Sequence, residues 1–180
     1  FSESTIYSFE PSHTTFEKLK TNATKKKHVH LINCAMGSSL GKMDFFENSH
    51  PEMSSFLPLS EFGWGTVAKK TLVEVKTIDQ FCKDEHIEKI DILKSDTQGF
   101  DLEVFRGAEQ TIRANKIGLI YFELIISDMY KDLPSFSKIY DFLTSNGFQL
   151  VSFYDSHYQK NLLSWVDVLF VHKSYFRSEK

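Results

Sequence analysis

The sequence has few cysteines and no long hydrophobic run. Cys34 and Cys82 are its two cysteines, and two isolated thiols predict neither a disulfide framework nor a zinc knuckle. Unpaired cysteines favour a reducing compartment such as the cytoplasm, although only slightly. No apolar stretch approaches the roughly 20 residues that a membrane-spanning helix needs. No basic stretch followed by an apolar one predicts a signal peptide. We therefore expect no membrane segment in this chain.

The sequence also lacks an excess of charge of one sign. It has 21 lysines and arginines against 24 acidic residues, a formal net charge of −3 at pH 7. No global field therefore attracts nucleic acid or a membrane surface. The basic run 25–27 predicts a solvated turn. His28 and His30 would share one face of a strand, but no third ligand lies nearby, so we predict no metal site.

Strand and helix patterns alternate along the 180 residues, a length that fits one domain. Apolar and β-branched runs predict strands at 5–9, 28–33, 72–75, 90–93, 117–124, 149–154 and 165–172. Helical periodicity predicts helices that begin after Ser12, Thr77, Asp101 and Pro134. This alternation is typical of a doubly wound, Rossmann-like α/β sheet, and the last two strands predict an antiparallel pair. The run 117–124 is apolar almost throughout, as expected for a strand with helices on both faces.

Asp96 follows the predicted strand 90–93 and precedes a predicted helix. In an open α/β sheet this places its carboxylate at the carboxyl end of a strand, where ligands bind, and Gly99 permits the tight turn. A carboxylate in that crevice is well placed to orient a substrate or to take a proton. The alternative is that Asp96, Thr97 and Asp101 only cap the helix. The segment alone does not separate the two interpretations.

Residues 94–108, Lys-Ser-Asp-Thr-Gln-Gly-Phe-Asp-Leu-Glu-Val-Phe-Arg-Gly-Ala, resemble the signature of FkbM-type methyltransferases. The family pattern there is Lys-Ile-Asp-Val-Glu-Gly-Phe/Tyr-Glu-x-x-Val-Leu-x-Gly-Ala. The chain departs from it at Ser95, Gln98 and Asp101. Glutamine also occurs at the position of Gln98 within the family, which argues against an essential ionised side chain there.

The resemblance extends over almost the whole chain. The strand that ends Phe9-Glu10-Pro11 is similar to the family's second strand, which commonly ends Phe-Glu-Pro. Residues 33–37, Asn-Cys-Ala-Met-Gly, are similar to the family's Asn-x-Ala-Leu-Gly. Shorter matches occur at 54–57, 77–79, 121–123, 147–148 and 167–171. Each motif is weak alone, but their order and spacing together are specific.

The resemblance implies an S-adenosylmethionine-dependent enzyme that methylates a hydroxyl group of a small molecule or glycan. It implies that Glu10 binds the cofactor's ribose, since a carboxylate accepts two hydrogen bonds from a vicinal diol. It also implies that Ala35 and Met36 border the adenine, and that Asp96 is the catalytic carboxylate beside the cofactor. We expect Glu10 and Asp96 to face one crevice.

Three further residues are candidates for the substrate side of the site: Gln98, Glu123 and Trp64. Glu123 would end a buried strand, where its alternative role is a capped or solvated charge. Trp64 and Phe62 lie in the long aromatic-rich loop 47–70. Loops of this length are commonly functional, and the alternative is that these rings fold back to complete the core.

The family's first strand carries Asp-x-Gly-x-x-x-Gly, and none of the eight glycines here forms such a loop after an N-terminal strand. We therefore expect residues 1–173 to form a methyltransferase domain that lacks its first strand and glycine loop, followed by a tail at 174–180. We expect this fragment to be inactive alone. The rivals are a non-catalytic fragment or interaction module on the same fold, and a nicotinamide-dependent oxidoreductase, which would also need a glycine-rich turn.

Overall fold

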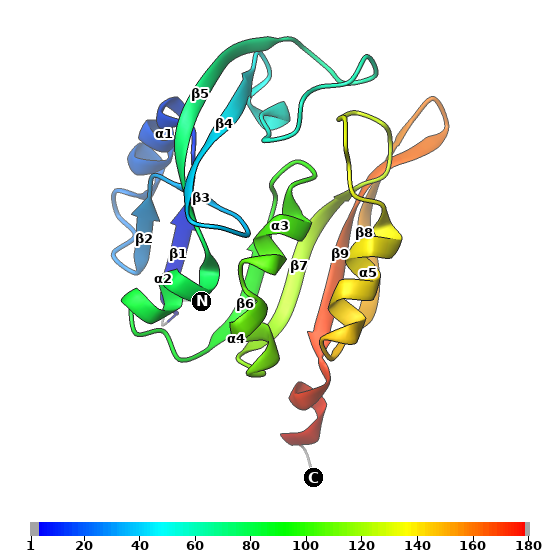
Figure 1. Cartoon of the computed structure of the whole chain (residues 1–180). Coiled ribbons are helices and arrows are strands. Elements are labelled where there is room, and N and C mark those ends of the chain that lie inside the picture. Colours follow the sequence, from blue (N-terminus) through cyan, green and yellow to red (C-terminus); the bar gives the residue numbers. More distant parts are fainter. Residues whose placement is uncertain (1–3, 179–180) are drawn as a thin grey trace.

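The computed structural model describes residues 4–178 (Figure 1). The strands are β1 (Ile6–Phe9), β2 (Val29–Ile32), β3 (Ala35–Met36), β4 (Gly41–Asn48), β5 (Val67–Lys76), β6 (Ile90–Ser95), β7 (Ile117–Ile125), β8 (Phe148–Gln159) and β9 (Leu162–His172). The helices are α1 (His13–Ala23), α2 (Ile78–Asp84), α3 (Asp101–Arg106), α4 (Glu109–Arg113) and α5 (Phe136–Ser145), with 3₁₀ turns η1 (Pro51–Met53) and η2 (Lys173–Ser178). Within residues 4–178, no helix is long and apolar enough to cross a membrane.

The largest sheet has the strand order β6-β7-β9-β8. β6 and β7 are parallel, whereas β9 runs antiparallel to both β7 and β8. The predicted antiparallel pair at the end of the sheet is therefore present, and its strands are longer than expected. Lys160 and Asn161 join β8 to β9 with φ of 48° and 65°. Two consecutive left-handed residues suit a tight hairpin, because their twist matches that of the strands.

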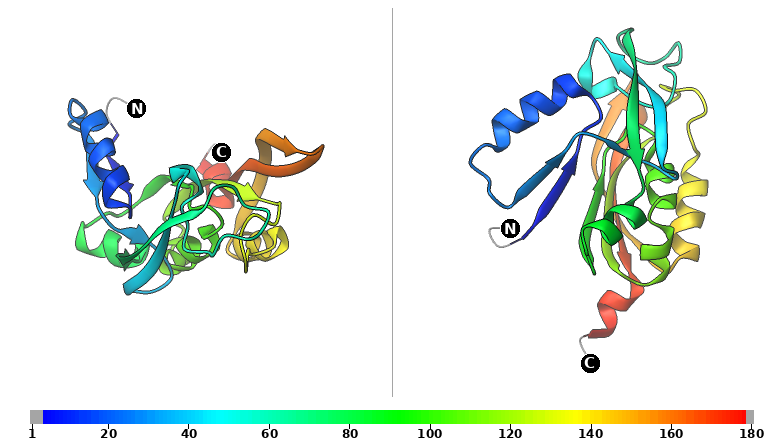
Figure 2. Two further views of the ribbon diagram at one scale, coloured as in Figure 1. Left: turned by 90° about the horizontal axis from the view of Figure 1, so that it is seen from above. Right: turned by 60° about the vertical axis from the view of Figure 1, so that its left-hand side comes forward.

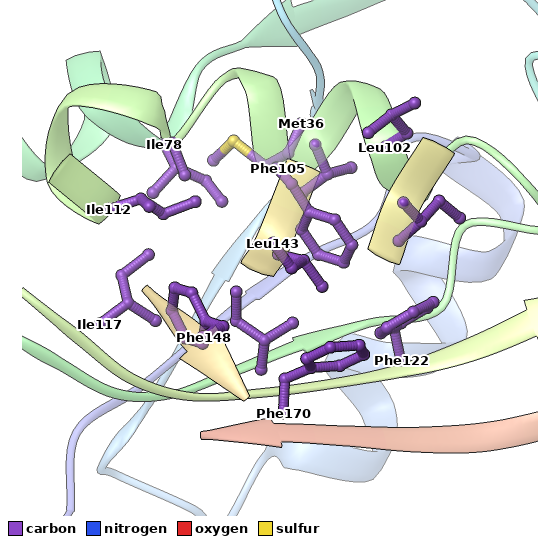
Figure 3. Close-up of a cluster of buried hydrophobic side chains, with 14 of the residues drawn as sticks. Met36, Ile78, Leu102, Phe105, Ile112, Ile117, Phe122, Leu143, Phe148 and Phe170 are labelled. Atoms are coloured by element: carbon purple, nitrogen blue, oxygen red, sulfur yellow. The ribbon is translucent and has the colours of Figure 1, made fainter. Parts of the chain in front are cut away.

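One face of this sheet is covered by α3, α4 and α5 and forms the main core (Figures 1 and 3). Ile120 and Phe122 of β7 and Val168 and Phe170 of β9 are fully buried there. These residues alternate along their strands, so their side chains share one face. Phe105 of α3 packs edge-on against Phe122, with ring centroids 5.3 Å apart.

The other face of the same sheet carries no helix among the described residues. Leu119, Tyr121 and Glu123 of β7 alternate with the core residues and are only half-buried, and Ile92 of β6 is exposed. The prediction that helices cover both faces of this strand is therefore wrong for residues 4–178. The run 117–124 is nearly continuous in apolar residues because Leu119 and Tyr121 add hydrophobic bulk to the open face.

β1 and β2 form a separate parallel pair, in which Ile6 lies opposite Val29 and Phe9 opposite Ile32. Helix α1 joins them and lies on the opposite side of the molecule from α3, α4 and α5 (Figure 2). No ladder joins β1 to β6 within the described part of the chain. Helices therefore lie on both sides of the molecule as a whole. The absence of a strand between β1 and β6 stays a prediction.

A third sheet has the order β3-β5-β4, with β4 and β5 antiparallel. The sequence predicted β5 only at 72–75, because the residues before it are polar. The chain between β4 and β5 folds back towards the end of β7. Met53 and Tyr130 meet Ile125 and Met129 there in a small apolar cluster. The predicted tail at 174–180 begins within η2, where Lys89 lies over the Tyr175 ring at 5.5 Å.

Candidate functional site

Side chains from β6 and β7 meet at the carboxyl ends of these two parallel strands. Ser95 of β6 pairs with Phe122 of β7, so the residues that follow them, Asp96 and Glu123, lie on neighbouring strands at one edge. Gln98 bridges the two: its Nε2 donates to Glu123 Oε1 at 2.7 Å and to Asp96 Oδ1 at 3.3 Å. The structure therefore brings together three of the predicted site residues.

The turn after β6 holds Gln98 in an unusual backbone conformation. Gln98 and Gly99 have φ of 52° and 89°, a left-handed region that costs a non-glycine residue about 1–2 kcal/mol. The positive φ favours glycine at position 99, and a Cβ there would also displace the end of the Leu133 side chain, whose Cδ1 would lie 2.5 Å away. The Ser55 hydroxyl donates to the Gln98 carbonyl at 2.8 Å and helps to hold the turn.

Tyr130 fixes the amide of Gln98 from the other side. Its ring is buried in the cluster with Met53 and Ile125, and its hydroxyl lies 3.0 Å from Gln98 Oε1 and 3.1 Å from the Met53 carbonyl, both acceptors. Burial and the nearby charge of Glu123 raise the pKa of Tyr130 well above its usual range, so the phenol keeps its proton. Because carboxylates only accept hydrogen bonds, the Gln98 Nε2 faces Asp96 and Glu123, and its Oε1 lies beside the Tyr130 hydroxyl.

The two bridged carboxylates differ in their surroundings. Asp96 is exposed and lies 3.5 Å from Lys94 Nζ. Glu123 is half-buried, and no cation pairs with it among the described residues. Burial first, and then the charge of Asp96, raise the pKa of Glu123 to about 7, although the Gln98 hydrogen bond opposes the shift. Glu123 therefore exchanges its proton near neutral pH.

Asp101 is a fourth acid near this edge, but it faces the core. It begins α3, is 2% exposed and accepts a hydrogen bond from the Ser95 hydroxyl. Burial raises its pKa to about 6. The N-cap of α3 is Phe100, and no side chain caps it. The partners of Asp96 are Gln98 and Lys94 instead, so the interpretation of Asp96 as a mere helix cap is not supported.

The signature ends in Gly107 and Ala108 because two backbones meet there. A Cβ on Gly107 would lie 2.0 Å from the Gly37 carbonyl oxygen, and Ala108 is completely buried. The Gly107 carbonyl accepts a hydrogen bond from Asp79 N at 2.9 Å. A side chain at position 107 would push the loop after β3 away from the helices, so this part of the signature is structural.

Glu10, the predicted ribose ligand, directly follows β1, which belongs to a different sheet from β6. Its Oε1 accepts from Ser12 N at 2.7 Å, and the Ser12 hydroxyl donates to Glu47 at 2.9 Å. Burial first, and then the charge of Glu47, raise the pKa of Glu10. Among the contacts of residues 4–178, none joins Glu10 to Asp96, so a shared crevice for these two stays a prediction.

Ala35 and Met36, the predicted neighbours of the adenine, form β3 after the β1–β2 pair. Their side chains are 3% and 8% exposed and pack into two different core clusters. Only their backbone edge is therefore suited to a ligand. β3 pairs with β5, and Ala35 lies opposite Val75. Because β3 also follows β2 closely in the chain, its backbone edge lies where the chain passes from the β1–β2 pair to the β3-β5-β4 sheet.

Trp64, predicted for the substrate side of the site, lies in the loop between β4 and β5. Its ring packs edge-on against Trp165 at 5.6 Å. Trp165 is two residues from Asp167 on β9, and Asp167 lies opposite Glu123. Trp64 is 43% exposed and Phe62 62%, so neither ring completes the core. Met53 of the same loop packs inward instead, and a role of the two exposed rings in covering the substrate stays a prediction.

Sequence reasoning missed several residues around Glu123. Tyr130 lies in the loop after β7, and Asp167 accepts a hydrogen bond from the Tyr121 hydroxyl on the open face. That contact raises the pKa of Tyr121 to about 12. The position of Tyr130 just after a parallel strand was the available signal, because ligand sites lie at such ends. For Asp167 the signal was its alternation with buried valines.

No group of three histidine, cysteine or acidic side chains within residues 4–178 has the arrangement of a metal site. The polar groups of the site are the carboxylates of Asp96 and Glu123, the neutral amide of Gln98 and the neutral phenol of Tyr130. Such a set can accept a hydroxyl proton and orient the hydroxyl oxygen.

The structure is a mixed α/β fold with a turn between β6 and α3 and acids at the carboxyl ends of neighbouring parallel strands. The family model described as "Methyltransferase FkbM domain" matches residues 1–150. The chain therefore belongs to the FkbM methyltransferase family, as its motifs indicated.

The chain is also similar to 2-O-methyltransferase NoeI of Sinorhizobium fredii (strain NBRC 101917 / NGR234). The two are 25% identical over 158 residues, which cover 82% of this chain and 63% of the relative. The chain thus spans somewhat less than two thirds of the length of this relative. No solved structure matches the chain.

Proposed function

We propose that the protein is an S-adenosylmethionine-dependent methyltransferase that acts on a hydroxyl group. Its membership of the FkbM family supports the reaction class. The observation that carries the proposal is the bridge of Gln98 between Asp96 and Glu123 at the carboxyl ends of β6 and β7. This arrangement offers one exposed and one half-buried carboxylate to a hydroxyl.

The chain's own residues would supply positioning and proton transfer. A bound S-adenosylmethionine would supply a methyl group on a positively charged sulfur. Asp96 is the proposed catalytic carboxylate, because its exposed position lets it orient the acceptor hydroxyl or take its proton. Methyl transfer depends mainly on alignment of the two reactants. The rigid turn at Gln98 and Gly99 therefore matters as much as the charge.

Glu10, Ala35, Met36 and Asp96 are the proposed cofactor ligands. Glu10 fits a ribose in one respect: its half-buried carboxylate directly follows a strand and, within residues 4–178, accepts a single hydrogen bond, from Ser12 N. The buried side chains of Ala35 and Met36 leave their backbone edge for the adenine. The family's glycine loop is not among residues 1–180. We propose that the doubly wound sheet, and with it cofactor binding, requires a further strand between β1 and β6.

The proposed acceptor is a hydroxyl of a small molecule or glycan. The similar protein from Sinorhizobium fredii is named a 2-O-methyltransferase, which supports an oxygen acceptor. Gln98, Glu123 and Trp64 are the proposed contacts on this side. The exposed ring of Trp64 next to Trp165 offers an aromatic wall to such a ligand. The net charge of −3 does not favour nucleic acid.

The test is methyl transfer by the full-length protein, with a radiolabelled methyl donor and a panel of sugars and hydroxylated small molecules. We expect Asp96→Asn to lower turnover about 10²–10⁴-fold, as removal of a catalytic carboxylate usually does. Calorimetry with S-adenosylmethionine should show a much smaller change in affinity. If the variant transfers methyl groups at the wild-type rate, Asp96 has no catalytic role.

A further inference from the structure

The hydrogen bonds around Gln98 form a directed chain that ends on Glu123. Tyr130 donates to Gln98 Oε1, and Gln98 Nε2 donates to Glu123 Oε1. An ionised carboxylate only accepts hydrogen bonds, so the chain has one consistent direction. A flipped amide would put Oε1 against the Glu123 carboxylate, so that two acceptors faced each other. Tyr130 supports the observed orientation, because its hydroxyl lies beside Gln98 Oε1 as well as the Met53 carbonyl.

We propose that Glu123, not Asp96, receives the proton of the acceptor hydroxyl, and that Gln98 and Tyr130 are positioning residues for it. The inference rests on the proposed function. Gln98 occupies Oε1 of Glu123, and no hydrogen bond to Oε2 occurs among the described residues. Oε2 is thus the oxygen that remains to accept a proton. Asp96 keeps the role of orienting the hydroxyl.

The charges that face Glu123 make it the better proton acceptor of the two. Asp96 from β6, Asp101 from α3 and Asp167 from β9 all act on it, and each is negative. Asp96, by contrast, is exposed and has Lys94 within 3.5 Å. A base works best when its pKa lies near the working pH, and Glu123, at about 7, meets that condition.

The step balances with a sulfonium methyl donor as co-reactant. The hydroxyl oxygen forms a bond to the methyl carbon while the sulfur–carbon bond breaks, and its electron pair stays on sulfur. The O–H bond breaks and the proton passes to Glu123 Oε2. The products are a methyl ether, a neutral thioether and a protonated Glu123, which then loses its proton to solvent.

The first experiment measures methyl transfer by the full-length protein as a function of pH, with Glu123→Gln, Asp96→Asn and a control, Asp91→Asn. Asp91 is exposed at the amino end of β6, where it pairs with Lys89. The wild-type rate should rise through a midpoint near pH 7. Glu123→Gln should lose about 10²–10⁴-fold in kcat together with that pH step. The control should keep both.

The second experiment titrates Glu123 in the ligand-free protein by carboxyl ¹³C NMR, in the wild type and in Tyr130→Phe. The phenylalanine keeps the ring in its apolar cluster but removes the hydroxyl beside Gln98 Oε1, so the amide is held less firmly against Glu123. We expect the midpoint of Glu123 to move to higher pH, and the pH profile of the rate to move with it. A purely structural Tyr130 would change neither.

Two results would overturn the inference alone. The first is a Glu123→Gln variant that transfers methyl groups within a few-fold of wild type. The second is loss of the pH step in Asp96→Asn while it persists in Glu123→Gln. A wild-type protein that binds the donor yet methylates no hydroxyl would instead refute the proposed function, whatever the titration of Glu123 shows.

Discussion

The two faces of the β6-β7-β9-β8 sheet differ although the same strands build both. On the covered face, Phe122 and Val168 are completely buried beneath helices. On the open face, the next residues along each strand include Glu123 and Asp167, which lie opposite each other and are half-buried. Strand alternation thus places stabilising groups and chemically active groups one residue apart. Mutations of adjacent residues should therefore have separable effects.

The largest expected effect is the loss of stability in Phe122→Ala, compared with Glu123→Gln at the adjacent residue. Phe122→Ala removes a buried ring between Phe105 and Phe170, and such a cavity costs about 3–5 kcal/mol in the free energy of unfolding. Glu123→Gln on the opposite face should cost about 1 kcal/mol or less, since the amide fits the same space. Urea unfolding followed by circular dichroism measures both. Equal losses would mean that the open face is as tightly packed as the core.

Asp101 is the acid on the covered side, and it should make stability depend on pH. Its pKa rises from the usual 3.8 to about 6 on folding, so the folded state holds a proton that the unfolded state releases. Stability is therefore highest below pH 4 for this group and falls as the pH rises from about 4 to 6. The loss is about 3 kcal/mol, at 1.36 kcal/mol for each pKa unit.

Asp101→Asn should remove this fall of about 3 kcal/mol in the unfolding free energy between pH 4 and 6. Phe122→Ala is the control, because a cavity lowers the curve equally at every pH. If Asp101→Asn leaves the slope of the unfolding free energy between pH 4 and 6 unchanged, burial does not raise the pKa of the Asp101 carboxyl.

Glu10 allows a similar test at the other end of the molecule. Removal of a charged acceptor costs about 1.5–3 kcal/mol, or 10–150-fold in affinity. We expect calorimetry to show this loss of S-adenosylmethionine affinity in Glu10→Ala of the full-length protein. Glu17→Ala, an exposed acid on α1 paired with Lys20, is the matched control. An unchanged affinity in Glu10→Ala would refute the ribose assignment.

The smallest expected effect is that of Gln98→Glu. Glutamate is the commoner family residue there, which predicts that the change is tolerated. In this structure, however, the new carboxylate would replace a donor 2.7 Å from Glu123. We expect a stable protein with turnover within about tenfold of wild type, whose pH midpoint moves upward because the two acids then share a proton. A larger loss would mean that this site has diverged from the family.

The sequence predicted elements well where the signals were local. Ser12 and Thr77 cap α1 and α2 through their side chains, as expected, and β6 and β7 lie within two residues of their predicted ends. The single helix predicted to begin after Asp101 is instead two short helices, α3 and α4. Asp79 causes the break, because it accepts hydrogen bonds from the backbone of Gln110 and Thr111 at 2.9 and 2.8 Å. No local pattern reveals a cap supplied from 30 residues away.

The residues of the candidate site were likewise predictable where their signals were local. Asp96, Gln98 and Glu123 were accessible to sequence reasoning because each follows or ends a strand, and their mutual contacts follow from the parallel pairing of β6 with β7. The contribution of Tyr130 depends on the loops after β4 and β7 meeting at Met53 and Ile125. The side-chain packing of such loops is set by tertiary contacts, which periodicity does not encode.

The contact between Trp64 and Trp165 gives the protein an optical signal at its candidate site. These are the only two tryptophans in the sequence, and His157 stacks on Trp165 with ring centroids 4.9 Å apart. All of the indole fluorescence therefore comes from Trp165, two residues from the Asp167 that lies opposite Glu123, and from Trp64 in the loop between β4 and β5. An acceptor that docks against these rings will change their emission, so binding can be followed without a label and without turnover.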